Sequence, residues 1–107
     1  TVIYYYICAY TVIVTFDSNL KDDDISKFDC GAVVNGLVNA AWSRGLGAVI
    51  NSQGIMQSPV VRHYAKIPEE ETIMICVAMG YPDDTFPANK VVSKRRSISE
   101  VAKFKGF

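Results

Sequence analysis

Residues 72–80 read T-I-M-I-C-V-A-M-G, a run in which Thr72 is the single polar side chain. A strand covered on one face alternates apolar and polar residues, whereas a strand covered on both faces has an almost continuous apolar sequence. This run therefore predicts a strand at the centre of a layered fold.

The first sixteen residues, Thr1–Phe16, also have the composition of a strand. Nine of them are Thr, Val or Ile and five more are Tyr or Phe, which are residue types enriched in sheets. The segment is short for a membrane-spanning helix and lacks the positive start and cleavage site of a signal peptide. We expect one long strand with an irregularity near Cys8–Tyr10, or two strand segments, and then an acidic loop over Asp17–Lys27. Because the chain begins directly with an apolar strand, we expect it to be a piece of a larger protein.

Between these strands, the spacing of apolar residues predicts a long helix over Asp29–Arg44. Asp29 is its expected N-cap, and Gly45 is expected in the left-handed conformation just after its end. The two glycines inside it, Gly31 and Gly36, each lower helix propensity by about 1 kcal/mol, which is tolerable if another backbone packs closely there. The predicted apolar stripe comprises Val33, Val34, Leu37, Val38, Ala41 and Trp42.

A short strand over Ala48–Ile50 and a second helix follow. Ser58 is the expected N-cap of this helix, and Pro59 suits its first position because the missing N–H would be unpaired there anyway. The order of strand, helix, short strand, helix, strand and basic tail indicates an α+β or α/β layered fold. The predicted inner face of the second helix comprises Val60, Val61, Tyr64 and Ala65.

The composition describes one soluble domain spanning residues 1–107. Half of the residues are hydrophobic, 21% are charged and the net charge is zero, which excludes intrinsic disorder and argues against general nucleic-acid binding. The cysteines, Cys8, Cys30 and Cys76, have no CxxC spacing and are expected as buried thiols in a reducing, cytoplasmic compartment. His63 is the only histidine, so we expect no metal site.

Two polar features remain as candidates for function, since the sequence contains no Ser-His-Asp arrangement, P-loop or dinucleotide fingerprint. One is the loop Asn51-Ser52-Gln53-Gly54, held between an apolar segment and a helix; loops fixed by rigid elements often carry function. The other is the cluster Lys94-Arg95-Arg96, flanked by Ser93 and Ser97, which suits a phosphate group. From composition alone, the cluster is equally consistent with a solvated tail.

An ordered series of short motifs resembles the C-terminal half of the FMN-dependent nitroreductase family. The resemblance is good over residues 29–107 and looser over residues 1–16. The motifs are Asp29-Cys30-Gly31, Ala40-Ala41, Gly45-Leu46-Gly47, Asn51–Gly54, Met79-Gly80-Tyr81-Pro82, Asn89, Lys94-Arg95-Arg96 and Ile98-Ser99-Glu100-Val101.

The resemblance implies a partial three-layer α/β/α sandwich of the α+β class, with an extended C-terminal arm. It places the loop Asn51–Gly54 along the flavin of FMN, with a backbone N–H of Gln53 or Gly54 donating to the reactive ring nitrogen. It places Lys94, Arg95 and Arg96 at the FMN phosphate, with Arg95 the strongest candidate. It also implies a homodimer. The expected reaction passes hydride from NAD(P)H to the flavin, and the reduced flavin then reduces a nitroaromatic, quinone or similar acceptor. No catalytic side chain is expected.

The chain also departs from that family. Family members are much longer, and their N-terminal half supplies an Arg-rich segment that holds the ribityl phosphate and the pyrimidine edge of the flavin. Here the basic residues before position 60 are only Lys21, Lys27 and Arg44. Either another chain supplies the rest of the site, or the sequence is a fragment, or flavin binding has been lost. The alternative function is therefore a non-catalytic remnant that acts as a dimerisation or ligand-binding subunit.

Overall fold

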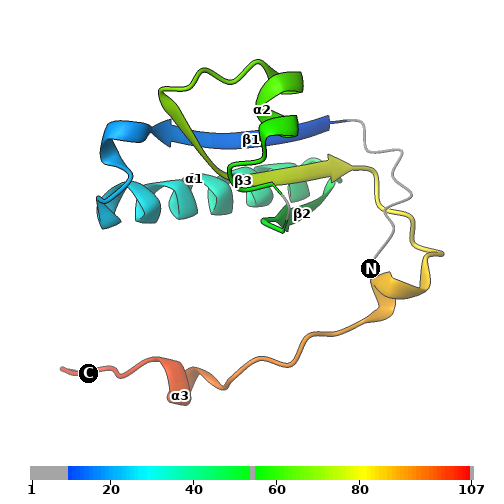
Figure 1. Ribbon diagram of the computed structural model, residues 1–107. Coiled ribbons are helices and arrows are strands. Elements are labelled where there is room, and N and C mark those ends of the chain that lie inside the picture. The colour runs from blue at the N-terminus through cyan, green and yellow to red at the C-terminus, as the bar shows by residue number, and fades with distance from the viewer. Residues whose placement is uncertain (1–9, 54, 107) are drawn as a thin grey trace.

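The computed structural model describes residues 10–53 and 55–106 as a three-stranded sheet with helices and a long C-terminal arm (Figure 1). In chain order the elements are β1 (Tyr10–Asp17), the 3-10 turn η1 (Ser18–Leu20), α1 (Asp24–Trp42), β2 (Gly47–Asn51), α2 (Pro59–Ala65), β3 (Glu71–Gly80), the 3-10 turn η2 (Pro87–Lys90) and α3 (Ile98–Val101).

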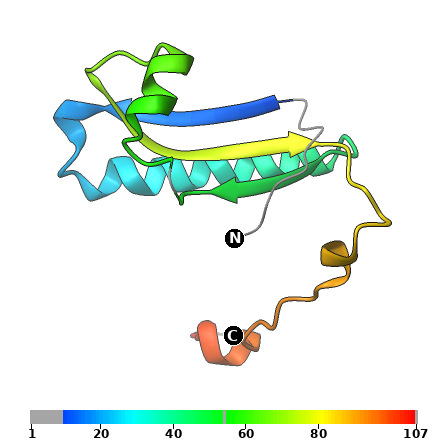
Figure 2. The same cartoon turned by 45° about the vertical axis from the view of Figure 1, so that its right-hand side comes forward.

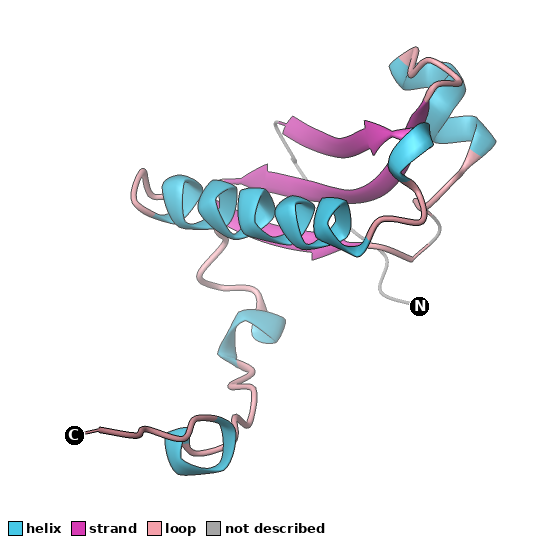
Figure 3. Ribbon diagram, turned by 90° about the vertical axis from the view of Figure 1, so that its left-hand side faces the viewer, coloured by secondary structure: helices cyan, strands magenta, loops and turns pink. Residues whose placement is uncertain are grey.

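The predicted central strand is confirmed as β3. The sheet order is β1-β3-β2, and β3 pairs with both neighbours in antiparallel register, with Ile13 opposite Cys76 and Ile50 opposite Val77. Ile73 and Val77 have no exposed surface. β1 pairs along nearly all of β3, β2 pairs with its second half, and α1 packs against the sheet (Figure 3). The α+β class expected from the order of elements is thus what the chain adopts.

The described part of the first strand has an irregularity at a position that the sequence did not indicate. The irregularity predicted near Cys8–Tyr10 lies mostly outside the described residues, and Tyr10 pairs with Met79. Within the described part of the strand, the register shifts between Val14 and Thr15. A bulge of this kind lets two residues of one strand oppose one of the other and increases the local twist.

Helix α1 begins five residues before the predicted start. Its N-cap is Asp23, not Asp29: the Asp23 carboxylate accepts hydrogen bonds from the backbone N–H groups of Ile25, at 3.2 Å, and Ser26, at 3.0 Å. The predicted acidic loop is therefore partly helical. The error arose because three consecutive aspartates offered several possible caps, and the apolar periodicity begins only after the true start.

One face of α1 packs on the sheet, and this face is narrower than the predicted stripe. Val34 and Ala41 are buried, together with Cys30, whereas Val33 and Trp42 are 61% and 72% exposed. The prediction that Val33 and Trp42 belong to the packed stripe is therefore wrong. No described atom lies within 4 Å of a Cβ built at Gly31 or Gly36, apart from chain neighbours and the helix's own nearby backbone, so the described residues supply no close backbone contact there.

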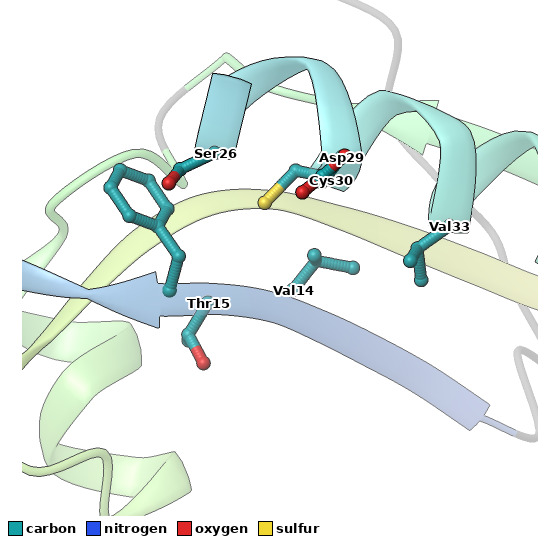
Figure 4. A pocket seen from close by; sticks show the side chains of 7 residues that line it. Val14, Thr15, Ser26, Asp29, Cys30 and Val33 are labelled. Carbon is teal, nitrogen blue, oxygen red and sulfur yellow. The ribbon is translucent and has the colours of Figure 1, made fainter. Parts of the chain in front are cut away.

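Helix α2 lies on the side of the sheet opposite α1 (Figures 1 and 4). Its start is as predicted, with Pro59 in the first turn and the Ser58 hydroxyl accepting from Val61 N–H at 3.3 Å. Its predicted inner face is wrong in part, because Val60 and Tyr64 are 62% and 82% exposed. None of the seven residues of α2 is buried.

Beyond β3 the chain leaves the sheet as an extended arm, residues 81–106, that carries η2 and α3 (Figure 2). Every described residue of the arm is exposed except Ala102. None of the helices in the described part of the chain is long and apolar enough to cross a membrane.

Candidate functional site

The turn after β2 carries the first group of candidate residues. β2 ends where Asn51 pairs with Cys76 of β3, so the sheet fixes the start of the turn. Ser52 then closes the turn, because its carbonyl accepts hydrogen bonds from Ile55 N–H at 3.2 Å and from Met56 N–H at 3.5 Å. Asn51 is half-buried, whereas Ser52 and Gln53 are exposed; Gly54 lies outside the described residues.

This turn offers a hydrogen-bond donor to solvent. The backbone N–H of Gln53 has no acceptor among the described residues. An exposed N–H on a turn that is anchored at both ends can donate to a ligand without a large loss of backbone entropy. Gln53 therefore has a backbone donor that is available to a ligand.

The second group, Lys94, Arg95 and Arg96, lies on the arm between η2 and α3, and all three side chains are exposed. Arg95 Nη1 donates to the neighbouring Lys94 carbonyl at 3.3 Å. The described part of the chain gives none of the three a carboxylate partner. Their positive charges are thus available to an anion from elsewhere.

Within one chain, the structure does not bring the two groups together. The arm leaves β3 at Gly80, which pairs with Gly47 at the start of β2, whereas the turn follows Asn51 at the other end of β2. In Figures 1 and 2 the arm runs away from the sheet. The fourteen residues from Gly80 to Lys94 could span at most about 46–50 Å, enough to reach a surface of this subunit or of another.

Local hydrogen bonds give the arm its shape. Asp83 accepts from the hydroxyl of Thr85 at 2.7 Å and from its backbone N–H at 2.9 Å, and these bonds lower the pKa of Asp83. Glu100 accepts from the hydroxyl of Ser97 at 2.7 Å and from its backbone N–H at 2.8 Å, which lowers the pKa of Glu100 in the same way. Both carboxylates thus form hydrogen bonds within short local segments of the arm.

A shallow cavity of about 250 Å³ lies between β1 and α1, away from both groups (Figure 4). Val14 and Val33 line it, and the Cys30 thiol points toward it beside Asp29. It is below the size of about 300–1,000 Å³ that is usual for small-molecule pockets. It contains none of the predicted site residues, and we assign it no ligand.

The remaining candidates from the sequence have structural roles. Cys30 and Cys76 are buried, as predicted; Cys8 is not among the described residues. His63 is exposed, with its ring edge-to-face against Tyr64 at a centroid distance of 5.2 Å. No group of three or more potential metal ligands occurs among the residues that the structure describes.

Sequence reasoning missed two residues next to the turn, Gln57 and Arg62. Gln57 adopts a left-handed conformation with φ of 56°, and Arg62 donates hydrogen bonds to several carbonyls around it. One signal was present: an arginine in the last turn of a short helix that is followed within six residues by Pro68. A side chain there can serve the carbonyls that the helix end and the proline leave unpaired.

Comparison with known proteins shows to which family the chain belongs. The model of the nitroreductase family matches residues 4–81. Nitrobenzene nitroreductase of Ectopseudomonas oleovorans is 26% identical over 94 residues, which are 87% of this chain and 40% of that protein. The chain thus spans well under half the length of this curated relative. Because the family match covers most of the chain, including the whole sheet and the turn after β2, the chain belongs to the nitroreductase family.

Proposed function

We propose that the chain forms part of an FMN-dependent NAD(P)H oxidoreductase of nitroreductase type. The observation that carries the proposal is the anchored turn after β2, which holds an available backbone N–H at Gln53 in a member of this family. A backbone donor fixed by a sheet is the kind of group that tunes a bound cofactor without itself reacting. The relative's name, nitrobenzene nitroreductase, agrees with a nitroaromatic acceptor.

FMN, when bound, would supply the redox chemistry by accepting hydride from reduced nicotinamide and passing two electrons to a nitroaromatic, quinone or similar acceptor. The residues of this chain bind and orient. Gln53 N–H, with Gly54 as the neighbouring candidate, donates to the ring, and Asn51 and Ser52 set the position of the turn. No catalytic side chain is required, and protons can come from solvent at the exposed turn.

The cationic cluster would hold the phosphate of FMN. Its three exposed side chains have no carboxylate partner among the described residues, and guanidinium groups bind phosphate oxygens in a bidentate manner. Since one chain keeps the cluster apart from the turn, we propose that the site is completed across subunits, in a homodimer or with a complementing chain. The arm is then the element that carries phosphate-binding residues to the partner.

A spectrum tests the proposal directly. The purified chain should bind added FMN and turn yellow, with one FMN per chain at saturation, and NADH or NADPH should bleach the bound flavin in the absence of oxygen. Anaerobic addition of nitrobenzene should then restore the colour. A chain that stays colourless after incubation with excess FMN would overturn the assignment.

A second function is favoured by the exposed apolar surface of α1. Phe28 and Trp42 are 74% and 72% exposed, although large exposed apolar patches are uncommon on monomers. In this alternative the chain is a non-catalytic family remnant that serves as a dimerisation or ligand-binding subunit. A colourless protein that sediments as a dimer would support this function over the first.

A further inference from the structure

The two strands next to β3 pair with different lengths of it. β1 pairs along its whole length, from Glu71 to Met79, whereas β2 pairs only from Cys76 to Gly80. On the β2 side, the first half of β3 therefore has no strand partner among the described residues. Buried or half-buried carbonyls rarely remain without a donor, because the loss of hydrogen bonding to water is costly.

Two side chains take the place of the missing strand. Gln57 Nε2 donates to the Ile73 carbonyl at 3.3 Å, and Arg62 Nη2 donates to the Glu71 carbonyl at 2.8 Å. These carbonyls belong to alternate residues of β3, as do successive acceptors on one edge of an antiparallel strand. The two side chains also contact each other, since Arg62 Nη2 donates to Gln57 Oε1 at 3.3 Å.

Four of the five N–H donors of the Arg62 guanidinium have a hydrogen-bond acceptor in this position. Nη1 donates to the carbonyls of Pro68 and, at 3.4 Å, Ile67; Nη2 serves Glu71 and Gln57; and Nε faces Glu69 Oε2 at 4.0 Å. The Arg62 side chain is only 16% exposed. A planar fork with five donors can satisfy such a set of acceptors, whereas the three donors of an ammonium group cannot reproduce its geometry.

Gln57 connects the hydrogen bonds of Arg62 to the turn after β2. Its backbone has φ of 56°, a conformation that costs free energy for a residue with a side chain and persists only where its surroundings hold it. The backbone N–H groups of Ile55 and Met56 donate to the Ser52 carbonyl, which ties the residues just before Gln57 to the residue that follows β2. β2 fixes the start of this turn, and the carboxamide of Gln57 fixes its end.

We propose that Arg62 is a positioning residue for the flavin-binding turn and acts through Gln57. This inference rests on the proposed function, because the group that it positions is the backbone N–H of Gln53. Arg62 does not contact the cofactor. It holds the end of the turn against β3, so that the donor at Gln53 keeps one orientation.

The test uses Arg62→Lys, which keeps the charge and loses the fork. Hydrogen–deuterium exchange should speed up about tenfold within residues 52–57, the size expected when hydrogen bonds to a charged group are lost. Binding of FMN should weaken about tenfold and the midpoint potential of bound FMN should shift. The matched control is Arg44→Lys, since exposed Arg44 also donates to a carbonyl, that of Ala40 at 3.2 Å, but lies at the end of α1; it should behave like the wild type.

A second variant, Gln57→Ala, keeps the inference falsifiable if Arg62→Lys fails to fold. It should produce the same changes, and the double variant should be no worse than the more severe single variant, because both remove one anchor. Unchanged exchange in residues 52–57 would overturn the inference, and so would faster exchange with unchanged FMN affinity and potential. If the wild-type chain binds no FMN, the proposed function fails and the flavin role of Arg62 fails with it; the exchange data then show separately whether Arg62 holds the turn.

Discussion

The sheet with its helices and the C-terminal arm are built on different principles. In residues 10–80, apart from Gly54, long-range pairing buries Ile73 and Val77 completely. In residues 81–106, side-chain hydrogen bonds join residues no more than six positions apart, and Ala102 alone is not exposed. The described contacts therefore fix the position of the turn after β2, whereas they do not fix the position of the basic cluster on the arm.

The charged residues are also distributed unequally between these two regions. Residues 81–107 contain six basic and three acidic side chains, and residues 1–80 contain five basic and eight acidic ones. The zero net charge of the whole chain therefore hides a positive arm attached to a negative body. An arm of this kind is attracted to phosphate and to an acidic neighbouring surface, which suits a segment that completes a site on another subunit.

The largest expected effect is a difference in how much a substitution in each region lowers the free energy of unfolding. Ile73→Ala removes a fully buried side chain from β3 and should lower the free energy of unfolding by about 3 kcal/mol, the usual cost of such a cavity. Ile98→Ala, at a 71% exposed position on the arm, is the matched control and should stay within about 0.5 kcal/mol of the wild type. Urea unfolding followed by circular dichroism measures both. Similar losses in the two variants would show that the arm packs on the body in solution.

The comparison also explains how far the sequence could predict the fold. β3 was recognised from its continuous apolar run, and α2 was recognised from Ser58 and Pro59, because these signals are local. Gly45 is likewise in the expected left-handed conformation, with φ of 75°. The start of α1 was wrong because Asp23, Asp24 and Asp29 are equivalent as local caps.

Some errors reflect neighbours that the local sequence does not describe. Val33 and Trp42 are apolar at helical spacing but exposed, since β1, β3 and β2 cover only one face of α1. For the site, the residues Asn51–Gln53 and Lys94–Arg96 could be chosen from their composition and the family resemblance. The sequence could not predict where the two groups lie relative to each other, or that Gln57 and Arg62 anchor the turn. Both features depend on where β2 stops pairing with β3.

A smaller effect tests the role of the arm in the site. Arg95→Ala should weaken retention of FMN about tenfold at moderate salt, because a hydrogen bond between charged groups contributes about 1.5–3 kcal/mol and salt screens the remaining attraction. Lys103→Ala, an exposed cation further along the arm, is the control and should have little effect. Fluorescence titration with FMN measures the affinity. Equal effects of the two variants would mean that the arm attracts the phosphate only through its overall charge, and that the placement of the phosphate site at Arg95 is wrong.

The smallest effect is a pH dependence that distinguishes two carboxylates with similar local bonding. The hydroxyl of Ser26, followed by the backbone N–H groups of Ile25 and Ser26, lowers the pKa of Asp23, and Ser97 lowers the pKa of Glu100. A group with a lowered pKa in the folded state stabilises that state above its unfolded pKa, about 4, and this stabilisation is lost as the pH falls through the folded value.

Asp23 caps α1, which packs on the sheet, so its titration is coupled to unfolding of the whole body. Asp23→Ala should therefore lower the urea midpoint at neutral pH and flatten its decline below about pH 4. Glu100 serves only the four-residue helix α3 on the arm, so Glu100→Ala should leave the urea midpoint of the body unchanged at every pH, although the local titration disappears. Urea midpoints measured at a series of pH values test both statements. A decline that is flattened equally by both substitutions would contradict the separation of arm and body, since it would require α3 to unfold together with the sheet.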